Sequence, residues 1–263
     1  MEAKPSIIIP SLGRTKELDE CLQSISDQPY RPYEVVIVKD EGPLAWCRNK
    51  GARLASGNIL IFIDDDVVVS KTWLQTISEV LGSRDDLAGL SGPSVITSDY
   101  RNNRDVFKDT LIKRLHDKIF LGELMDLPGH ITDSGAWTTG ASREDCSYEG
   151  SVEFLEACNM SFKREAFQQV GGFDESYKGI GDWSEPDLCF RLRQRGKRLW
   201  FTRNALLYHR PSKTGAYKKR LKRCSRMENY LLFSSRWVKP SMRHSAYKLF
   251  MATYYWMKEN RLA

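Results

Sequence analysis

Three short apolar segments, each followed by a polar loop and an amphipathic helix pattern, constrain the fold of this chain more than any other feature. The apolar segments cover residues 6–9, 34–38 and 58–63, and the helix patterns cover residues 15–26, 45–55 and 72–81. The apolar segments are continuous rather than alternating, which is typical of parallel strands covered by helices on both faces. The order of elements therefore predicts an α/β fold with a mostly parallel central sheet flanked by helices.

The remaining patterns predict further elements of the same kind. We expect Thr15 to cap the first helix and Gly57 to end the second. Residues 111–124 favour a helix and residues 126–150 long loops. Later patterns predict helices at 164–170 and 185–195 and strands at 198–201 and 205–208. Two more helices, separated by Pro240, are expected at the C-terminal end; the apolar side of the second would hold Ala246, Leu249, Phe250, Thr253 and Met257.

Charge divides the chain into an acidic body and a basic tail. The 263 residues carry 40 Lys and Arg against 34 Asp and Glu, a net charge of +6. Residues 211–263 hold 13 of the basic residues and two Glu, so residues 1–210 carry 27 basic and 32 acidic residues. Such an asymmetry often marks contact with a polyanion or an anionic membrane, although a solvated basic helix face is an equal alternative.

Polar residues follow each of the three apolar segments. They are Pro10 and Ser11, then Asp40 and Glu41, then the three acids Asp64, Asp65 and Asp66. The carboxyl ends of parallel strands meet at one rim of the sheet, where ligands bind. Three adjacent carboxylates repel each other unless a cation compensates, and Mg²⁺ and Mn²⁺ prefer such oxygens. The pattern predicts a metal–diphosphate site, with a plain acidic turn as the alternative.

A second acidic cluster covers residues 182–188. Glu185 precedes Pro186 at the expected start of a helix and could act as a general base on a hydroxyl group, or could simply cap that helix. Trp183 could stack on a sugar ring or pack in the core, and His209 could bind a metal or serve a structural role. No P-loop, Gly-x-Gly-x-x-Gly or Gly-x-Ser-x-Gly motif is present, and no Cys-x-x-Cys pair occurs among the six cysteines.

These segments together resemble glycosyltransferase family 2, the inverting enzymes with the GT-A fold. The resemblance spans about residues 5–210, with the matching segments in the order of the family. The matching segments are residues 7–11, 35–42, 47–51, 57–66, 171–175, 183–188 with Arg191, Leu192 and Gly196, and 207–209.

The resemblance implies a Rossmann-like GT-A domain and a nucleotide-diphosphate sugar donor. It implies residues 1–210 as the glycosyltransferase domain, of which 1–96 bind the donor and 97–210 the acceptor, and residues 211–263 as a basic helical extension. Donor-binding residues would be Pro10, Ser11, Arg14, Asp40, Arg48, Asp64 and Asp65. The metal, Mn²⁺ or Mg²⁺, would be held by Asp66, Asp64 and His209.

The resemblance also implies a mechanism. Glu185 would remove a proton from an acceptor hydroxyl, which would attack the anomeric carbon in a single inverting displacement, with Asp182 and Trp183 binding the acceptor. The chain departs from the family at this point, because Ser184 and Glu185 replace the usual acidic pair; Asp187 therefore remains a second candidate for the base. Lys213, Lys218, Lys219 and Arg220 could close over the diphosphate.

The sequence leaves the acceptor and the wider function open between several alternatives. The leading hypothesis is transfer to a glycan or a lipid-linked saccharide, by a cytoplasmic protein whose tail can rest on the inner face of a membrane. One alternative keeps the fold but makes a modified base of nucleic acid the acceptor, held by the basic tail. Further alternatives are a nucleotidyltransferase, which also uses paired aspartates and a metal, and a non-catalytic binding module.

Overall fold

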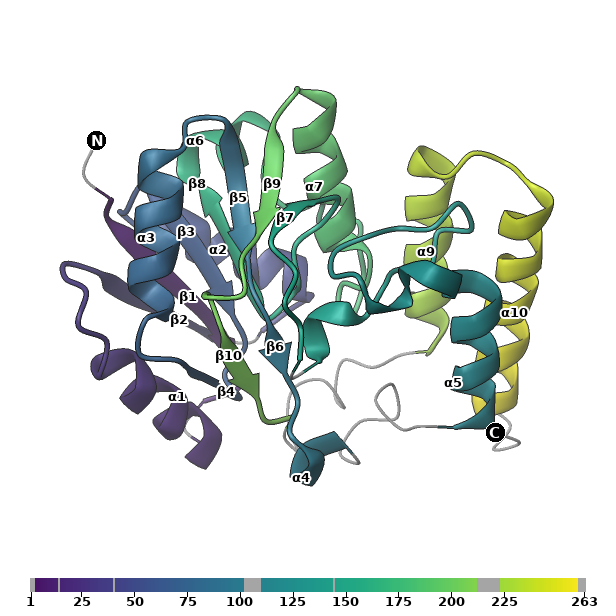
Figure 1. Ribbon diagram of the computed structural model, residues 1–263, viewed down its shortest axis with the longest axis horizontal. Helices are drawn as coiled ribbons and strands as arrows, with labels where there is room; N and C mark the ends of the chain where they lie inside the picture. Colours follow the sequence, from purple (N-terminus) through teal and green to yellow (C-terminus); the bar gives the residue numbers. More distant parts are fainter. Residues whose placement is uncertain are drawn as a thin grey trace.

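The centre of the molecule is a seven-stranded sheet with the order β2-β1-β3-β8-β5-β9-β7 (Figure 1). The structure is a computed structural model that describes residues 3–13, 15–39, 41–101, 110–143, 145–211 and 223–259. The strands are β1 (Pro5–Ser11), β2 (Glu34–Lys39), β3 (Ile59–Ile63), β5 (Leu87–Ser91), β7 (Gly150–Val152), β8 (Asn159–Lys163) and β9 (Arg198–Phe201). β8 runs antiparallel to β3 and β5, and β7 antiparallel to β9, whereas the other pairs are parallel. The predicted mostly parallel sheet is confirmed.

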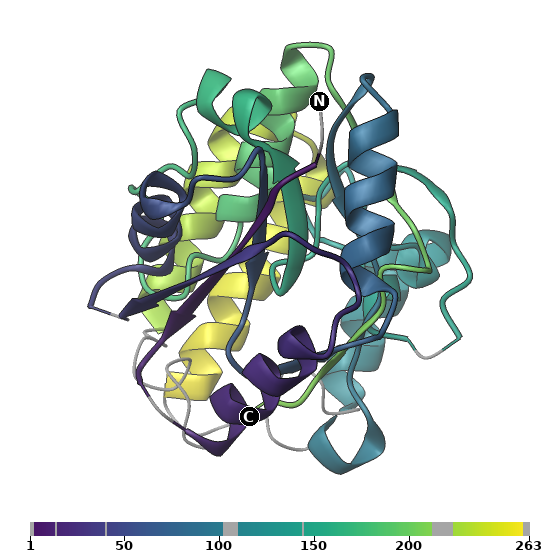
Figure 2. The ribbon, with the colours of Figure 1, turned by 90° about the vertical axis from the view of Figure 1, so that its left-hand side faces the viewer.

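Helices cover both faces of this sheet. Ile7 and Ile9 of β1 point to one face, where they pack with α1 (Lys16–Ser26) and α3 (Trp73–Ser83). Ile8 points to the other face, toward α2 (Leu44–Leu54), α6 (Arg164–Gln169) and α7 (Ser184–Gln194), as expected for side chains that alternate along a strand. Figure 2 shows α2 on one side of the sheet and α3 on the other.

Two local predictions are wrong. The second helix ends at Leu54 with an extended Ala55 as its C-cap, and not at a left-handed Gly57. Gly57 is required for another reason: a Cβ atom there would lie 2.1 Å from the Lys4 carbonyl oxygen, so only glycine lets the chain pass β1 this closely. Strand β2 is also not covered on both faces, since it lies at the sheet edge and leaves Val35 and Ile37 exposed.

A second, three-stranded sheet has the order β4-β10-β6. Its strands are β4 (Val67–Val69), β6 (Ser94–Val95) and β10 (Leu207–His209), and α4 (Ser98–Arg101) follows β6. In the antiparallel pair of β10 and β4, His209 lies opposite Val67. The backbone N–H of Arg210 donates to the carbonyl oxygen of Asp66 at 2.8 Å. This register brings His209 and Arg210 directly beside the aspartates that follow β3.

The helix predicted over residues 111–124 forms in three successive pieces. They are α5 (Leu111–His116), a π-helical turn η2 (Asp117–Leu121) and a 3-10 helix η3 (Gly122–Asp126); a further short 3-10 helix, η4 (Gly140–Ser142), lies in the predicted loop region. Thr110 caps α5 by accepting from the Lys113 N–H, as Thr15 caps α1. Gly122 has φ of 56°, a conformation that stops a right-handed helix.

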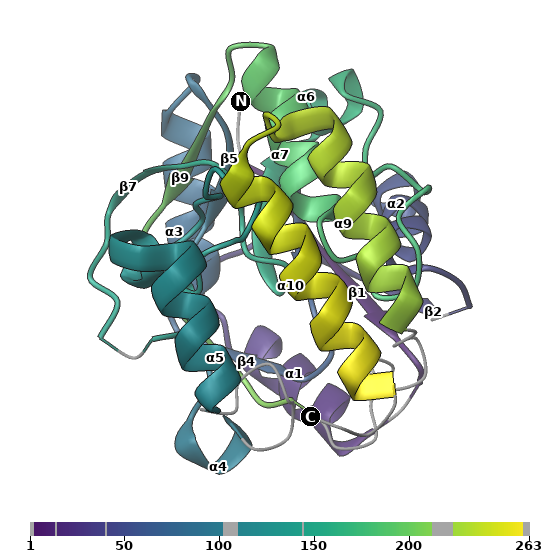
Figure 3. The same ribbon diagram turned by 90° about the vertical axis from the view of Figure 1, so that its right-hand side faces the viewer.

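The C-terminal region adds two long helices, α9 (Arg223–Trp237) and α10 (Met242–Glu259). In Figure 3, α10 lies between α5 and α9. The two C-terminal helices form a third core with residues from the middle of the chain, among them Phe120, Tyr177 and Trp183. The predicted apolar side of α10 is largely wrong: the buried side chains are Tyr247, Met251 and Tyr255, whereas Ala246, Leu249 and Thr253 are exposed. No helix among the described residues is long and apolar enough to cross a bilayer. The predicted division of the chain at residue 210 stays a prediction.

Candidate active site

Asp64, Asp66 and His209 form a compact cluster at the carboxyl end of β3. The Nε2 atom of His209 lies 3.1 Å from Asp66 Oδ1 and 4.0 Å from Asp64 Oδ2. One ligand atom from each residue falls within 4.8 Å of the other two. Asp66 and His209 are buried, while Asp64 is partly open to solvent. The structure therefore brings together the three residues that were predicted to hold a metal.

The chemistry of this cluster fits a divalent cation. Burial alone would lower the pKa of His209, but the charge of Asp66 outweighs it and raises the pKa to about 10. The cluster thus attracts positive charge strongly enough to hold a proton on a buried imidazole. A metal ion would take the place of that proton, because a histidine ligand must be neutral. Two carboxylates and one imidazole suit Mn²⁺, and carboxylates also suit Mg²⁺.

Asp65 turns away from this cluster and meets β1. The hydroxyl of Ser11 donates to Asp65 Oδ2 at 2.6 Å. Burial, with the charges of Asp66 and Asp64, raises the pKa of Asp65 to about 6, against the hydrogen bond from Ser11. Ser11 directly follows Pro10, so these predicted donor-binding residues lie together at the rim. Arg14 and Asp40, and the predicted basic segment with Lys213, Lys218, Lys219 and Arg220, lie outside the described residues.

Arg48 connects the aspartate rim to the predicted base. This side chain is 1% exposed, and its Nη1 atom donates to Glu185 Oε1. Its Nη2 atom donates to the carbonyl oxygen of Ala157 at 3.0 Å and lies 4.0 Å from Asp64 Oδ1. Burial raises the pKa of Glu185, and the charge of Arg48 opposes that shift. One buried guanidinium therefore holds the carboxylate of α7 next to the end of β3.

Glu156 is a second carboxyl group in this region that the sequence analysis missed. Its Oε1 atom is buried and has no hydrogen-bond partner among the described residues. Burial, and then the negative charge of Glu185, raise the pKa of Glu156 to about 7. The residue precedes Ala157, which accepts from Arg48. Its position between the apolar pairs Phe154-Leu155 and Ala157-Cys158 is the signal that could have identified it.

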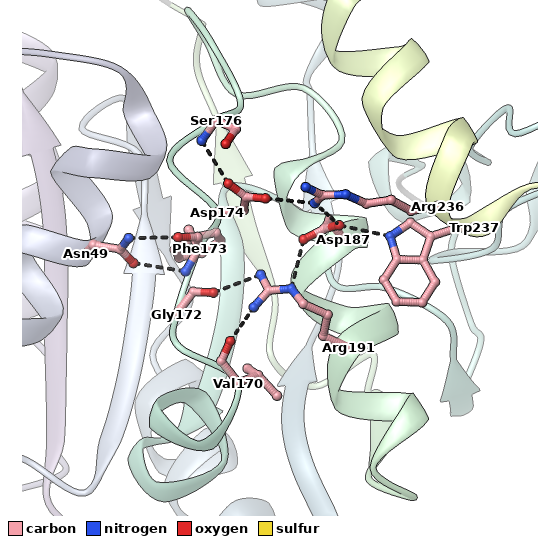
Figure 4. A network of polar contacts seen from close by, with 10 residues as sticks. All are labelled: Asn49, Val170, Gly172, Phe173, Asp174, Ser176, Asp187, Arg191, Arg236 and Trp237. Carbon is pink, nitrogen blue, oxygen red and sulfur yellow. Dashed lines mark hydrogen bonds and ion pairs between the residues drawn. The ribbon is translucent and has the colours of Figure 1, made fainter.

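Asp187 occupies a different environment from Glu185, although both lie in the first turn of α7. Asp187 is fully buried; its Oδ2 atom accepts from Arg191 at 2.9 Å. Its Oδ1 atom accepts from Arg236 at 3.0 Å and from the Trp237 indole at 2.9 Å. Figure 4 shows this carboxylate between the donors of α7 and α9, with Arg191 also reaching the loop at Val170 and Gly172. These contacts favour a structural role for Asp187.

The two predicted acceptor-binding residues both contact the helical layer. Asp182 accepts a hydrogen bond from Arg226 Nε of α9 at 2.5 Å, so the C-terminal region helps to position it. Trp183 is 1% exposed and has a positive φ of 67°, which is rare for a residue other than glycine. The centre of its ring lies 4.3 Å from the ring centre of Trp137 and 5.2 Å from that of Tyr230. Trp183 therefore packs in the third core and offers almost no surface to a ligand in this structure.

A small pocket of about 80 Å³ opens beside Asp66. Its lining combines acidic and basic side chains from α1 and the segment after β10. It consists of Lys16, Glu17, Glu20, Asp66, Val67, Val68, Tyr100 and Arg210. Of the three residues of the candidate metal cluster, only Asp66 lines this pocket, on the side of α1.

The sequence matches the family model described as "Glycosyltransferase like family 2" over residues 2–228. The chain belongs to this family, which confirms the predicted membership. A similar curated protein is the glucosyl-dolichyl phosphate glucuronosyltransferase of Haloferax volcanii, which is 23% identical over 237 residues. That match covers 76% of this chain and 66% of the relative, so the chain spans less than two thirds of the relative's length.

Solved structures confirm the predicted GT-A fold. One is TarS of S. aureus in complex with UDP-GlcNAc, with a TM-score of 0.61, 13% identity and coverage of 95% of this chain and 71% of that chain. Another is a mannosyltransferase from Pyrobaculum calidifontis in complex with GDP-Man and Mn²⁺, with a TM-score of 0.55, 14% identity and coverage of 98% and 70%. Identities this low show the fold alone.

Proposed function

We propose that this protein is an inverting glycosyltransferase that moves a sugar from a nucleotide-diphosphate donor to an acceptor hydroxyl with the help of a divalent metal. The observation that carries the proposal is the connection between two groups of acids. Arg48 joins Glu185 of α7 to Asp64 after β3, beside the cluster of Asp64, Asp66 and His209. A general base and a candidate metal site, from segments about 120 residues apart, thus share one buried arginine.

In this proposal Glu185 is the general base. Its carboxylate would accept the proton of the acceptor hydroxyl as that oxygen attacks the anomeric carbon from the side opposite the diphosphate. Burial raises the pKa of this carboxyl group, and the charge and hydrogen bond of Arg48 oppose that rise. Because the same guanidinium occupies Glu185 Oε1, the proton of the acceptor hydroxyl would pass to Oε2 or, if the guanidinium turns away, to Oε1.

Ser11 and Asp65 would hold the nucleotide part of the donor, and Asp64, Asp66 and His209 would hold Mn²⁺ or Mg²⁺. When bound, such a cation neutralises the negative charge that develops on the departing diphosphate. The proposal is supported by the donor set of the cluster, by its attraction for positive charge, and by the Mn²⁺ bound to the mannosyltransferase of the same fold.

For the acceptor, we propose a lipid-linked saccharide or lipid phosphate sugar. The support is the name of the Haloferax relative, whose acceptor is a glucosyl-dolichyl phosphate. A soluble glycan acceptor remains the second candidate within the same class, and a panel of both acceptor types with the preferred donor separates them.

The decisive experiment is a thermal-shift screen of UDP, GDP and TDP sugars with and without Mn²⁺, followed by measurement of donor hydrolysis. A true donor should raise the melting temperature only when the metal is present, because a ligand that binds the folded state stabilises it by mass action. Asp66→Ala should abolish the metal-dependent part of the shift, and Asp85→Ala, at a fully exposed acid, should leave it unchanged. If no nucleotide sugar shifts the wild type with Mn²⁺ or Mg²⁺, the proposal is wrong. NMR of the product's anomeric proton then tests inversion.

A further inference from the structure

Helix α10 carries an exposed apolar stripe on the side that faces away from the third core. Met242, Leu249 and Trp256 are 91%, 70% and 58% exposed. They are spaced by seven residues, so they lie on one side of the helix, with the exposed Ala246 and Thr253 between them. The opposite side is already buried, through Tyr247, Met251 and Tyr255. The helix therefore has two apolar sides, of which the fold uses one.

Helix α5 and the turn after it add a second stripe. Leu111, Leu115 and Ile119 are 72%, 48% and 54% exposed and follow a spacing of four residues. The two elements touch, because the Phe120 ring lies 4.8 Å from that of Tyr247 and 5.4 Å from that of Phe250. Phe120, Tyr247 and Phe250 lie where the two elements face each other, so both stripes lie on sides that point away from this contact. Figure 3 views the molecule from this side, with α5 and α10 in front.

We call the six side chains of the two stripes the α5–α10 face: Leu111, Leu115, Ile119, Met242, Leu249 and Trp256. Single exposed apolar residues are ordinary, but a set that gathers on two adjacent helices marks a surface that binds something apolar. Trp256 adds an amphipathic ring of the kind that is favoured where an apolar phase meets water.

Basic residues outnumber acidic ones among the described residues around this face, although Arg243 Nη1 lies 3.3 Å from Asp133 Oδ1 and Lys113 pairs with Asp117. No acidic residue occurs between Ser241 and Lys258, while Arg243 and Lys248 lie on α10 and Lys239 precedes it. On the other helix, the exposed Arg114 and Lys118 flank the stripe of leucines. Two copies of this face in contact would bring like charges together, whereas an anionic surface would complement them. Apolar stripes bordered by Lys and Arg are typical of helices that lie in a membrane interface.

We propose that the α5–α10 face docks this protein onto an anionic lipid bilayer, with its apolar side chains in the boundary between headgroups and acyl chains and with the basic residues on the phosphates. The attachment would be peripheral. It does not require the proposed transferase activity, since neither donor nor acceptor takes part in it. A chain of ring contacts from Tyr247 through Tyr230 to Trp183 places the start of α7 directly behind this face.

The test is flotation of the full chain with vesicles, without any nucleotide sugar. We expect binding to phosphatidylcholine vesicles that contain about one third phosphatidylglycerol, little binding to pure phosphatidylcholine, and weakening by salt. Leu249→Ser with Trp256→Ser should lower the apparent affinity at least tenfold. Leu54→Ser, at a leucine of α2 with similar exposure outside the face, should leave it unchanged. Arg114→Gln with Lys118→Gln should weaken binding several-fold, and Lys71→Gln should not.

A second measurement does not depend on disruptive variants. Brominated lipids should quench the tryptophan fluorescence of the wild type more than that of Trp256→Phe, since Trp256 would contact the acyl chains. Equal affinity of the wild type and the Leu249→Ser, Trp256→Ser variant would overturn the proposal, as would binding that ignores the anionic lipid. Absence of vesicle binding, together with a dimer that these substitutions dissociate in sedimentation velocity, would assign the face to a second copy instead. Donor-induced thermal shifts report on the proposed function separately.

Discussion

The sheet half of the molecule and its helical layer use apolar residues in opposite ways. In the sheet half, β1 and β3 bury every apolar side chain, and the polar residues gather where these strands end. In the helical layer of α5, η2, α9 and α10, apolar side chains lie on both the inner and the outer side. An apolar stripe in a sequence therefore predicts a surface that is removed from water. It does not show whether another part of the same chain or a different molecule buries that surface.

The largest effect is expected at α7, where the two halves meet. Glu185→Gln should lower the transfer rate by about 10²–10⁴-fold with donor affinity almost unchanged, because an amide cannot accept the acceptor's proton. It should also lower the melting temperature, because it leaves the buried Arg48 without its carboxylate partner. Single-turnover kinetics with saturating donor would measure this. Because burial raises the pKa of Glu185, the wild-type rate should fall with acid at a pH above the ordinary range of a carboxyl group. Near-normal turnover of the variant would exclude Glu185 as the base.

Substitution of Asp187 should lower the free energy of unfolding rather than act directly on the transfer reaction. Asp187→Asn leaves Arg191 and Arg236 without their shared buried carboxylate, and we expect a loss of about 3 kcal/mol in the free energy of unfolding. Asp174→Asn is the matched control, since Asp174 also pairs with Arg236 but is partly exposed, and should cost less than about 1 kcal/mol. Urea unfolding measures both. A catalytic defect of Asp187→Asn at unchanged stability would argue for a direct role in the reaction.

The two sides of α10 provide a sharper form of the comparison. Met251→Ala removes a buried side chain from the third core and should cost about 2 kcal/mol. Leu249→Ala, two residues earlier on the exposed side, should change the free energy of unfolding by less than about 0.5 kcal/mol. Equal losses in urea unfolding would show that the outer side is covered in solution by something other than water.

The smallest expected effect is the pH dependence of Glu156. Burial and the charge of Glu185 raise its pKa from 4.5 to about 7, so the folded state holds this proton more tightly than the unfolded chain. This group therefore makes the protein less stable as the pH rises through that range. Glu156→Gln cannot ionise and should melt above the wild type near pH 8, but not near pH 4. The same difference at both pH values would contradict the raised pKa. Glu123→Gln, at an exposed carboxyl group, is the control.

The sequence alone predicted the features that depend on neighbouring residues. The continuous apolar segments predicted β1, β2 and β3, Thr15 predicted the start of α1, and the acids after residue 63 predicted a cation-binding rim. The strand and cap predictions hold because strand pairing and capping act over a few residues, whereas binding of a cation at this rim stays a prediction. The C-terminal helices were also predicted, since their periodicity is local.

Tertiary structure decided which distant residues meet and which sides are covered. The pairing of β10 with β4 places His209 at Asp66, and Arg48 reaches Glu185 across 137 positions of sequence. Neither contact has a local signal, because each depends on how separate elements pack. The same reason explains the wrong side of α10: two stripes of similar hydrophobicity compete for the core, and the ring contacts of Phe120 and Tyr230 with Tyr247 select the aromatic one.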